Sequence, residues 1–201
     1  IMTEYTGKSI GRYQIYTLLG EGGMADVYHA FDTTLNCSVA IKFIRSEELT
    51  PASLRHTLKR FAREAQETAR LNHPNIVGIK DYGEYEGTPF LVMEYIPGGT
   101  VKDALEKKQV FPPQEAARIL APIARALGFA HSKGLIHRDV KPGNILLTET
   151  NMPVLSDFGI AKLMDEGIRS TLTGTGVGLG TAAYMAPEQW RGKPEPASDQ
   201  Y

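Results

Sequence analysis

Residues 137–144 read His137-Arg138-Asp139-Val140-Lys141-Pro142-Gly143-Asn144. This stretch places a carboxylate, an ammonium group and a carboxamide at fixed offsets on one short loop. Such a set can receive a hydroxyl proton, neutralise a phosphate group and hold a divalent metal ion. Thirteen residues further on, Asp157-Phe158-Gly159 places a second metal-seeking carboxylate on another turn. The two motifs together, in this order and spacing, are a much stronger signal than either one alone.

The hydrophobic pattern changes along the chain. β-Branched and alternating segments predict strands at residues 13–19, 25–31, 37–44, 76–82 and 89–94. Helical spacing starts near Pro51, and a longer helix is expected over residues 113–132 with Ile119, Leu120, Ile123, Leu127 and Ala130 facing inward. Thr100 and Asp103 form the pattern of a capping box at another helix start. Strands followed by helices predict two lobes joined by a linker near residues 94–100, and clefts between lobes are favoured ligand sites.

Bulk composition excludes several classes of function. The chain has 201 residues, a formal net charge of −1, 42% apolar residues and a single cysteine, Cys37. The near-zero charge predicts neither a nucleic-acid partner nor contact with a membrane surface. One cysteine excludes an internal disulfide framework and is typical of a reducing compartment. No apolar run approaches the roughly 18 residues of a membrane span, so we expect a cytoplasmic segment, whose parent protein could still be anchored further along the chain.

Together with Gly180-Thr181-Ala182-Ala183-Tyr184-Met185-Ala186-Pro187-Glu188, the two motifs resemble the eukaryotic-type protein kinase family. The likeness runs from about Tyr13 to the end and is greatest to bacterial serine/threonine kinases. It implies an α+β, bilobal protein-kinase-like fold. The N-lobe, residues 1–95, would be a small antiparallel sheet with one helix, and the C-lobe, residues 96–201, would be mainly helical and truncated at its central helix.

The resemblance also implies roles for the loop residues. Asp139 would accept the proton of the attacking hydroxyl, and Lys141 would neutralise charge on the transferring phosphoryl group. Asn144 and Asp157 would hold Mg²⁺, with Mn²⁺ as an alternative ion. His137 would be a packed residue beneath Phe158 rather than a general base. The other histidines show no metal-ligand spacing, and we expect them at the surface or at helix ends.

Lys42, in Val39-Ala40-Ile41-Lys42, matches the ATP-anchoring lysine of the family. A lysine that points inward from an apolar strand needs an anion, because an unpaired buried ammonium group is costly. The alternative is an ordinary surface lysine on an edge strand. By resemblance Glu64 would be its partner, and helical phase favours Glu64 over the rival Glu67.

The glycine-rich turn at residues 20–27 would bring backbone N–H groups close to phosphate oxygens. Taken alone, a glycine-rich turn of this kind favours a plain β-hairpin over a phosphate-binding loop. The family has a third glycine where this chain has Ala25, and a methyl group fits there if φ stays negative. The implied ATP-binding residues are Leu19, Gly20, Glu21, Gly22, Gly23, Met24, Val27, Ala40, Lys42, Met93, Glu94, Ile96 and Leu146, with Met93 as gatekeeper.

Four threonines are interleaved with four glycines in residues 171–181. By resemblance this is the activation segment, in which Thr171, Thr173 and Thr175 are candidates for autophosphorylation between two kinase molecules, and Arg138 could pair with the phosphate. The alternative is an ordinary solvated loop. Thr181 would help to seat the serine or threonine of a protein substrate.

Two other functions remain open: a kinase-like scaffold without turnover, and a small-molecule phosphotransferase. The first is disfavoured because Lys42, Glu64, Asp139, Asn144 and Asp157 are all present. The family continues beyond Tyr201, so we expect Asp199 to brace the catalytic loop and Glu188 to lack a later arginine partner. A buried carboxylate without its partner destabilises a protein by about 3–5 kcal/mol, so this stretch alone is expected to fold poorly or to expose an apolar face.

Overall fold

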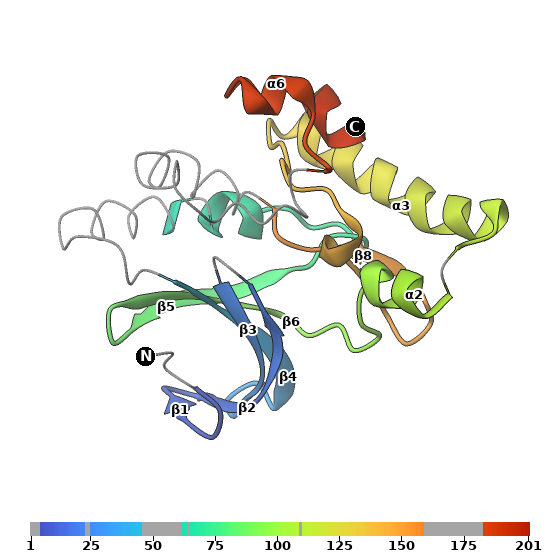
Figure 1. Ribbon diagram of the computed structural model, residues 1–201. Coiled ribbons are helices and arrows are strands. Elements are labelled where there is room, and N and C mark those ends of the chain that lie inside the picture. Colours follow the sequence, from blue (N-terminus) through green and yellow to red (C-terminus); the bar gives the residue numbers. More distant parts are fainter. Residues whose placement is uncertain (1–4, 23–24, 46–61, 64, 109, 159–182) are drawn as a thin grey trace. The chain divides into compact units, whose positions relative to one another are not determined.

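A computed structural model describes residues 5–22, 25–45, 62–63, 65–108, 110–158 and 183–201 (Figure 1). The chain divides into two compact units. The first comprises residues 1–69 and 78–95, and the second comprises residues 70–77 and 96–201. None of the helices in these described ranges is both long enough and apolar enough to cross a lipid bilayer.

The first unit is built on a six-stranded antiparallel sheet. Its strands are β1 (Ser9–Ile10), β2 (Tyr13–Glu21), β3 (Ala25–Asp32), β4 (Cys37–Ile44), β5 (Ile79–Tyr85) and β6 (Thr88–Glu94), in the spatial order β1-β2-β3-β4-β6-β5. Short hairpins join most neighbours, as expected for alternating strand segments separated by turn residues. Residues 62–63 and 65–69 are helical, within the segment where the sequence predicts a helix.

The prediction for β5 was three residues too early. Glu86 and Gly87 both have positive φ, 51° and 81°, as a two-residue type I′ hairpin requires, and this turn sets the register of β5 against β6. Ile76 instead forms a parallel bridge with Leu155 and packs in the second unit.

The two faces of the sheet have different roles. Val39, Ile41 and Phe43 alternate along β4 and are at most 2% exposed in an apolar core. Residues directly opposite each other share a face in an antiparallel pair, so the register places the pairs Val27–Lys42 and Ala40–Met93 together on the other face. One face therefore holds the core, and the other carries predicted nucleotide-binding residues.

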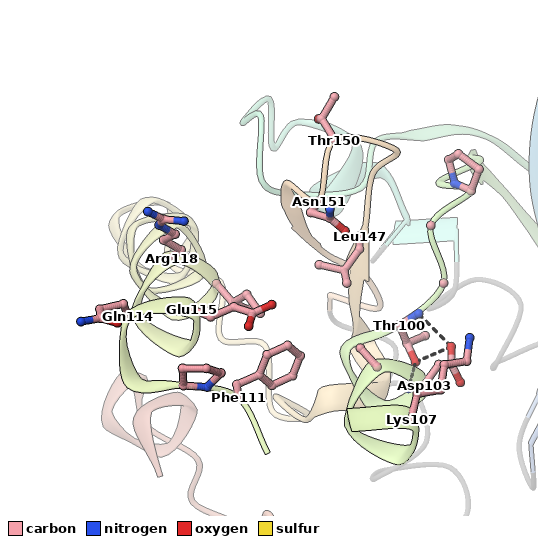
Figure 2. Close-up of a pocket in the computed structure, with 16 residues that line it drawn as sticks. Thr100, Asp103, Lys107, Phe111, Gln114, Glu115, Arg118, Leu147, Thr150 and Asn151 are labelled. Carbon is pink, nitrogen blue, oxygen red and sulfur yellow. Dashed lines mark hydrogen bonds between the residues drawn. The ribbon is translucent and has the colours of Figure 1, made fainter. Parts of the chain in front are cut away.

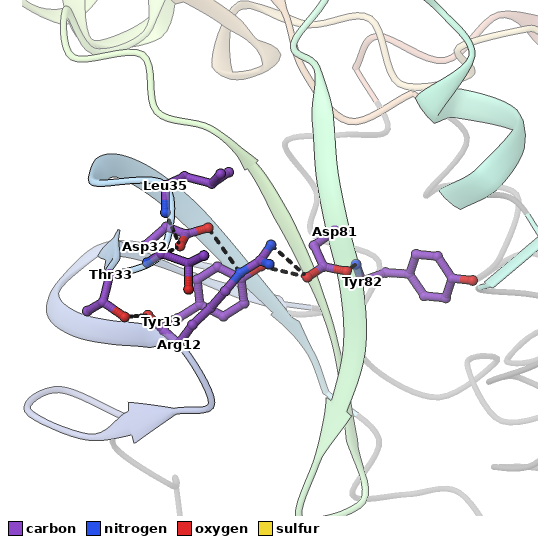
Figure 3. A network of polar contacts seen from close by, with 8 residues as sticks. Arg12, Tyr13, Asp32, Thr33, Leu35, Asp81 and Tyr82 are labelled. Carbon is purple, nitrogen blue, oxygen red and sulfur yellow. Dashed lines mark hydrogen bonds and ion pairs between the residues drawn. The ribbon is translucent and has the colours of Figure 1, made fainter.

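A polar network joins segments from opposite ends of the strand order (Figure 3). Arg12, between β1 and β2, lies 3.1 Å from Asp32 and 3.2 Å from Asp81 on β5, and the Tyr13 hydroxyl donates to Asp81 at 2.6 Å. Burial and this hydrogen bond raise the pKa of Tyr13 to about 12. Because β5 is the last strand in the order, these contacts require the sheet to curl.

The second unit is mainly helical. Its elements are α2 (Val101–Lys108), α3 (Pro113–Ser132), the short 3₁₀ helix η1 (Pro142–Asn144), the hairpin β7 (Ile145–Leu147) and β8 (Pro153–Leu155), α6 (Pro187–Trp190) and the 3₁₀ helix η2 (Pro196–Gln200). The capping box at α2 is confirmed, since Thr100 N–H donates to Asp103 at 2.8 Å and Asp103 N–H donates to the Thr100 hydroxyl at 3.0 Å.

Helix α3 has the predicted bounds, and its buried stripe is Ile119, Ile123, Ala126, Leu127 and Ala130. The prediction that Leu120 faces inward was wrong, because its side chain is 57% exposed. One residue after Ile119 turns the helix by about 100° and carries Leu120 off the stripe. The stripe packs on both strands of the β7–β8 hairpin in the core of this unit.

The segment that enters α2 is held against β7. Gly98 N–H donates to Leu147 O, and Leu147 N–H donates to Gly99 O, both at 2.9 Å. A Cβ atom at residue 98 would lie 2.3 Å from Leu147 O, so this close approach requires glycine. The contact fixes β7, and with it the end of the loop that contains Asp139.

Candidate active site

His137 is fully buried and uses both ring nitrogens. Nδ1 lies 3.1 Å from Asp139 N–H, Nε2 lies 2.7 Å from Ser156 O, and the ring packs edge-on to Phe158 with centroids 4.5 Å apart. Nδ1 must accept and Nε2 must donate, which fixes a neutral ring with its proton on Nε2. Burial lowers the pKa of His137, consistent with this state. The prediction that His137 is a packed structural residue is confirmed.

The carboxylate of Asp139 is held at one oxygen only. Oδ2 lies 2.8 Å from Lys141 Nζ and accepts a hydrogen bond from Asn144 Nδ2 at 2.9 Å. Asn144 Nδ2 also donates to the Asp139 carbonyl at 2.7 Å. Oδ1 is buried and has no hydrogen-bond partner among the described residues. A buried acceptor without a partner is costly, and an approaching hydroxyl group would satisfy it.

Asp157 follows β8, and the residue before it, Ser156, is hydrogen-bonded to Asn144. Ser156 donates to the Asn144 carbonyl from its backbone N–H at 2.9 Å and from its hydroxyl at 3.1 Å. Because Asn144 Nδ2 is used by Asp139, its amide oxygen is the atom suited to a cation. A carboxylate and a carboxamide oxygen are hard ligands of the kind that Mg²⁺ and Mn²⁺ prefer, so the residues present fit a divalent ion.

Asp199 braces the backbone of the catalytic loop, as predicted. Its side chain is fully buried and accepts the N–H groups of His137 at 2.8 Å and Arg138 at 2.7 Å. Arg138 has a φ of 70° and Asp157 a φ of 67°. Such conformations cost about 1–3 kcal/mol each outside glycine and persist where surrounding contacts enforce them.

His131 was expected at the surface or at a helix end, and it lies at a helix end. The sequence did not predict its partner: the side chain is only 15% exposed, and Nε2 lies 2.8 Å from Asp199 Oδ2. No local pattern marks this contact, because the two residues are 68 positions apart.

In the first unit, Arg45 binds both strands of the glycine-rich hairpin, a role that the sequence did not indicate. Arg45 donates to both carboxylate oxygens of Asp26, at 3.2 and 2.8 Å, and to Glu21 at 3.1 Å. These bonds, led by the one to Asp26, raise the pKa of Arg45. Glu21 ends β2 and Asp26 lies near the start of β3, so one guanidinium group ties both strands beside the turn.

The turn itself closes through its own backbone. Gly22 N–H donates to Ala25 O at 3.0 Å, so this amide is used within the hairpin. The backbone φ of Ala25 is not positive. The methyl group of Ala25 therefore meets the condition expected for a residue other than glycine at this position.

The remaining predicted residues of the nucleotide site are distributed over both units. Leu19 and Gly20 are exposed on β2, Met93 is buried on β6, and Glu94 is exposed at its end. In the second unit, Ile96 and Leu146 are both half-buried. Glu67, the rival for Lys42, pairs with Arg63 at 3.1 Å. Outside the described residues lie Gly23, Met24, Glu64, Thr171, Thr173, Thr175 and Thr181.

The second unit contains a pocket of about 1040 Å³, whose lining residues are drawn in Figure 2. It is lined by α2, the start of α3 and the β7–β8 turn, and its lining does not include Asp139, Lys141, Asn144 or Asp157. Asp103 and Lys107 line the pocket from α2, and Glu115 and Arg118 line it from α3, so each helix contributes one carboxylate and one cation. Asp103 caps α2, which lowers its pKa. The mixed charge gives no preference for an anionic or a cationic ligand.

The antiparallel sheet, the loop braced by Asp199 and the carboxylates of Asp139 and Asp157 on two separate loops indicate the class of protein. A family model of the protein kinase domain matches residues 13–200, and the chain therefore belongs to this family. Membership implies the use of ATP and a divalent metal ion in general.

Named relatives are bacterial. The chain is 43% identical over 185 residues to serine/threonine-protein kinase PknB of Mycobacterium leprae, covering 90% of this chain and 29% of that protein. It is also 43% identical over 197 residues to PknA of Mycobacterium tuberculosis, covering 95% and 44%. It thus spans less than half the length of these relatives. A crystal structure of a doubly mutated kinase domain of PknI from Mycobacterium tuberculosis has a TM-score of 0.77 and 29% identity, covering 100% of this chain and 72% of that one.

Proposed function

We propose that this chain is the catalytic part of a protein serine/threonine kinase, which transfers the γ-phosphate of ATP to serine or threonine hydroxyls of proteins. The observation that carries the proposal is the Asp139 carboxylate, with Oδ2 held by Lys141 and Asn144 and with Oδ1 buried and unpaired among the described residues. An acceptor held in this way can orient a hydroxyl and receive its proton.

The other site residues divide by unit. In the first unit, Lys42 and the face that carries Val27, Ala40 and Met93 would bind the nucleotide, with Glu64 as the partner of Lys42. In the second unit, Asn144 and Asp157 would hold Mg²⁺, or Mn²⁺ in its place. The metal ion would neutralise negative charge on the phosphates. Lys141 would add a positive charge at the transferring group, so positioning and electrostatics supply most of the catalysis.

We further propose activation by autophosphorylation at Thr171, Thr173 or Thr175, between two copies of the kinase. Arg138 supports this, because its Nε is buried and has no hydrogen-bond partner among the described residues. A phosphothreonine would supply acceptor oxygens for such a guanidinium group. We place this segment in the cytoplasm, where ATP is available, with protein substrates seated near Thr181.

The experiment that tests the proposal uses the natural full-length protein with ATP and Mg²⁺, and measures transfer to itself and to a generic protein acceptor. Asp139→Asn should lower transfer by about 10²- to 10⁴-fold, because it removes the proton acceptor, while nucleotide affinity is retained. Glu149→Gln, an exposed carboxylate changed in the same way, is the matched control and should be fully active.

Phosphosites mapped by mass spectrometry should include at least one of the three threonines in the unmodified protein and none in Asp139→Asn. Nucleotide binding without transfer by the unmodified protein would contradict the kinase proposal and favour a scaffold.

A further inference from the structure

Gln189 connects two parts of the second unit that are far apart in sequence. It is the third residue of α6, and its Oε1 accepts the Ala186 N–H at 3.0 Å while its Nε2 donates to the Arg138 carbonyl at 2.8 Å. A backbone N–H requires an acceptor and a carbonyl requires a donor, so the two partners fix the orientation of the amide. Both ends of the side chain are therefore in use.

Helix capping explains only one of these bonds. A glutamine at the third helical position commonly accepts the N–H of the capping residue, as it does here. The bond to Arg138 reaches 51 positions back along the chain and contributes nothing to a helix end. Its partner is the residue directly before Asp139.

Both backbone polar groups of Arg138 are hydrogen-bonded to side chains. Its N–H donates to Asp199 at 2.7 Å and its C=O accepts from Gln189, while its φ of 70° lies in the left-handed region. The two holding segments are themselves joined, because Ser198 and Glu188 share a hydrogen bond of 2.5 Å. This bond lowers the pKa of Glu188, which favours the charged acceptor.

We propose that Gln189 is a positioning residue, which fixes the Arg138 carbonyl and thereby the direction in which the Asp139 carboxylate points. The expected effect on phosphate transfer rests on the proposed kinase function, whereas the positioning of Arg138 rests on the hydrogen bonds alone.

The decisive variant is Gln189→Glu in the natural full-length protein. Glutamate has the same shape and keeps an acceptor for Ala186 N–H, but it cannot donate to Arg138 and places a negative charge against that carbonyl. We expect kcat for phosphate transfer to fall about five- to tenfold, the equivalent of one lost hydrogen bond, with KM for ATP unchanged. A merely structural defect would lower the active fraction of the protein and leave hydrogen exchange in the correctly folded catalytic loop unaltered.

Hydrogen exchange measured by mass spectrometry supplies the second readout. Peptides that cover residues 136–144 should exchange faster in Gln189→Glu, whereas peptides from β2–β4 should not change. Gln189→Met, which adds no charge, should show the same pattern. It replaces the glutamate variant in the test if that variant does not fold. Gln114→Glu, an exposed glutamine on α3, is the matched control and should resemble the unmodified protein.

The two hypotheses fail in different ways. If the unmodified protein transfers no phosphate, the proposed function is wrong, and the exchange of residues 136–144 alone decides the role of Gln189. Unchanged kcat together with unchanged exchange in both Gln189 variants would overturn the inference, as would a rise in KM for ATP with kcat unaltered.

Discussion

His137 illustrates how a buried titratable group can be structural in a site full of proton acceptors. Its two nitrogens hold Asp139 N–H and Ser156 O, which belong to the catalytic loop and the metal loop. A proton gained at Nδ1 would break the first of these bonds, since both nitrogens would then be donors. The neutral ring therefore fixes the backbone between the residues that do the proposed chemistry.

This arrangement predicts a pH dependence of stability. The pKa of folded His137 lies below its ordinary value of 6.5 because the ring is buried. The unfolded chain then binds the proton more readily, so the stabilisation is complete above pH 6.5 and is lost as pH falls through the folded pKa. We expect the free energy of unfolding, measured by urea titration between about pH 5 and pH 8, to decrease as the pH is lowered. The contribution of His137 to this decrease is at most about 1.4 kcal/mol per pH unit.

The comparison variant is His137→Phe, which keeps the contact with Phe158 but cannot titrate. Its unfolding free energy should be lower at neutral pH and should show a shallower slope below pH 6.5. Equal slopes in the two proteins would mean that His137 does not carry this dependence.

At the level of single residues, the sequence predicted groups whose chemistry depends on short fixed offsets. Asp139 and Asn144 lie five positions apart, and the loop brings them into contact. Arg45 and Gln189 went unnoticed because their partners lie 19 to 51 positions away. Composition marks neither residue, since an arginine after a strand and a glutamine in a helix are ordinary on a protein surface.

Among the elements, the glycine-rich hairpin depends on contacts outside its own sequence. Arg45 ties the strand ends on both sides of the turn through Asp26 and Glu21. Glu21 is 51% exposed, so the ion pair with it contributes little to global stability. Its effect should instead be local, on the spacing of the backbone N–H groups that the nucleotide phosphates would meet.

We therefore predict that Arg45→Met raises KM for ATP about three- to tenfold, the equivalent of roughly 1 kcal/mol of lost positioning, with the melting temperature nearly unchanged. Steady-state kinetics at low salt are the measurement, because ion pairs of this exposure are screened at high salt. Arg125→Met, an exposed arginine on α3, controls for the loss of a positive charge. A large fall in melting temperature with unaltered KM would assign Arg45 to stability rather than to nucleotide binding.

Element bounds followed from the sequence where local signals agreed. Helix α3 runs over Pro113–Ser132 as predicted, because its apolar stripe spans the whole segment. For β5 the apolar residues around Ile76 suggested an earlier strand, but the turn at Glu86 and Gly87 sets the register. A turn with two positive φ values outweighed hydrophobicity there, since it fixes which residues can pair.

For the molecule as a whole, the described residues form two separate cores. The core of the first unit is built from aromatic and β-branched side chains of the sheet, including Ile41, and that of the second from α3 and the β7–β8 hairpin, including Ile123. The two clusters share no residue. The change of periodicity predicts two lobes, at residues 1–95 and 96–201, whereas Leu71 and Ile76 pack in the core of the second unit.

Separate cores predict that local stability can be changed in one unit at a time. Ile41→Val and Ile123→Val each remove one methylene from a side chain that is 0% and 2% exposed, which should cost about 0.5–1.5 kcal/mol. Hydrogen exchange should then accelerate about two- to tenfold within the substituted unit, in β2–β4 and β6 for the first variant and in α3, β7 and β8 for the second. Each unit serves as the control for the other, because the chemical change is identical. If either variant accelerated exchange equally in both units, the prediction would be wrong and the protein would unfold as one cooperative body. In that case every amide that exchanges only through global unfolding would report the same loss of stability, whichever unit carries the substitution.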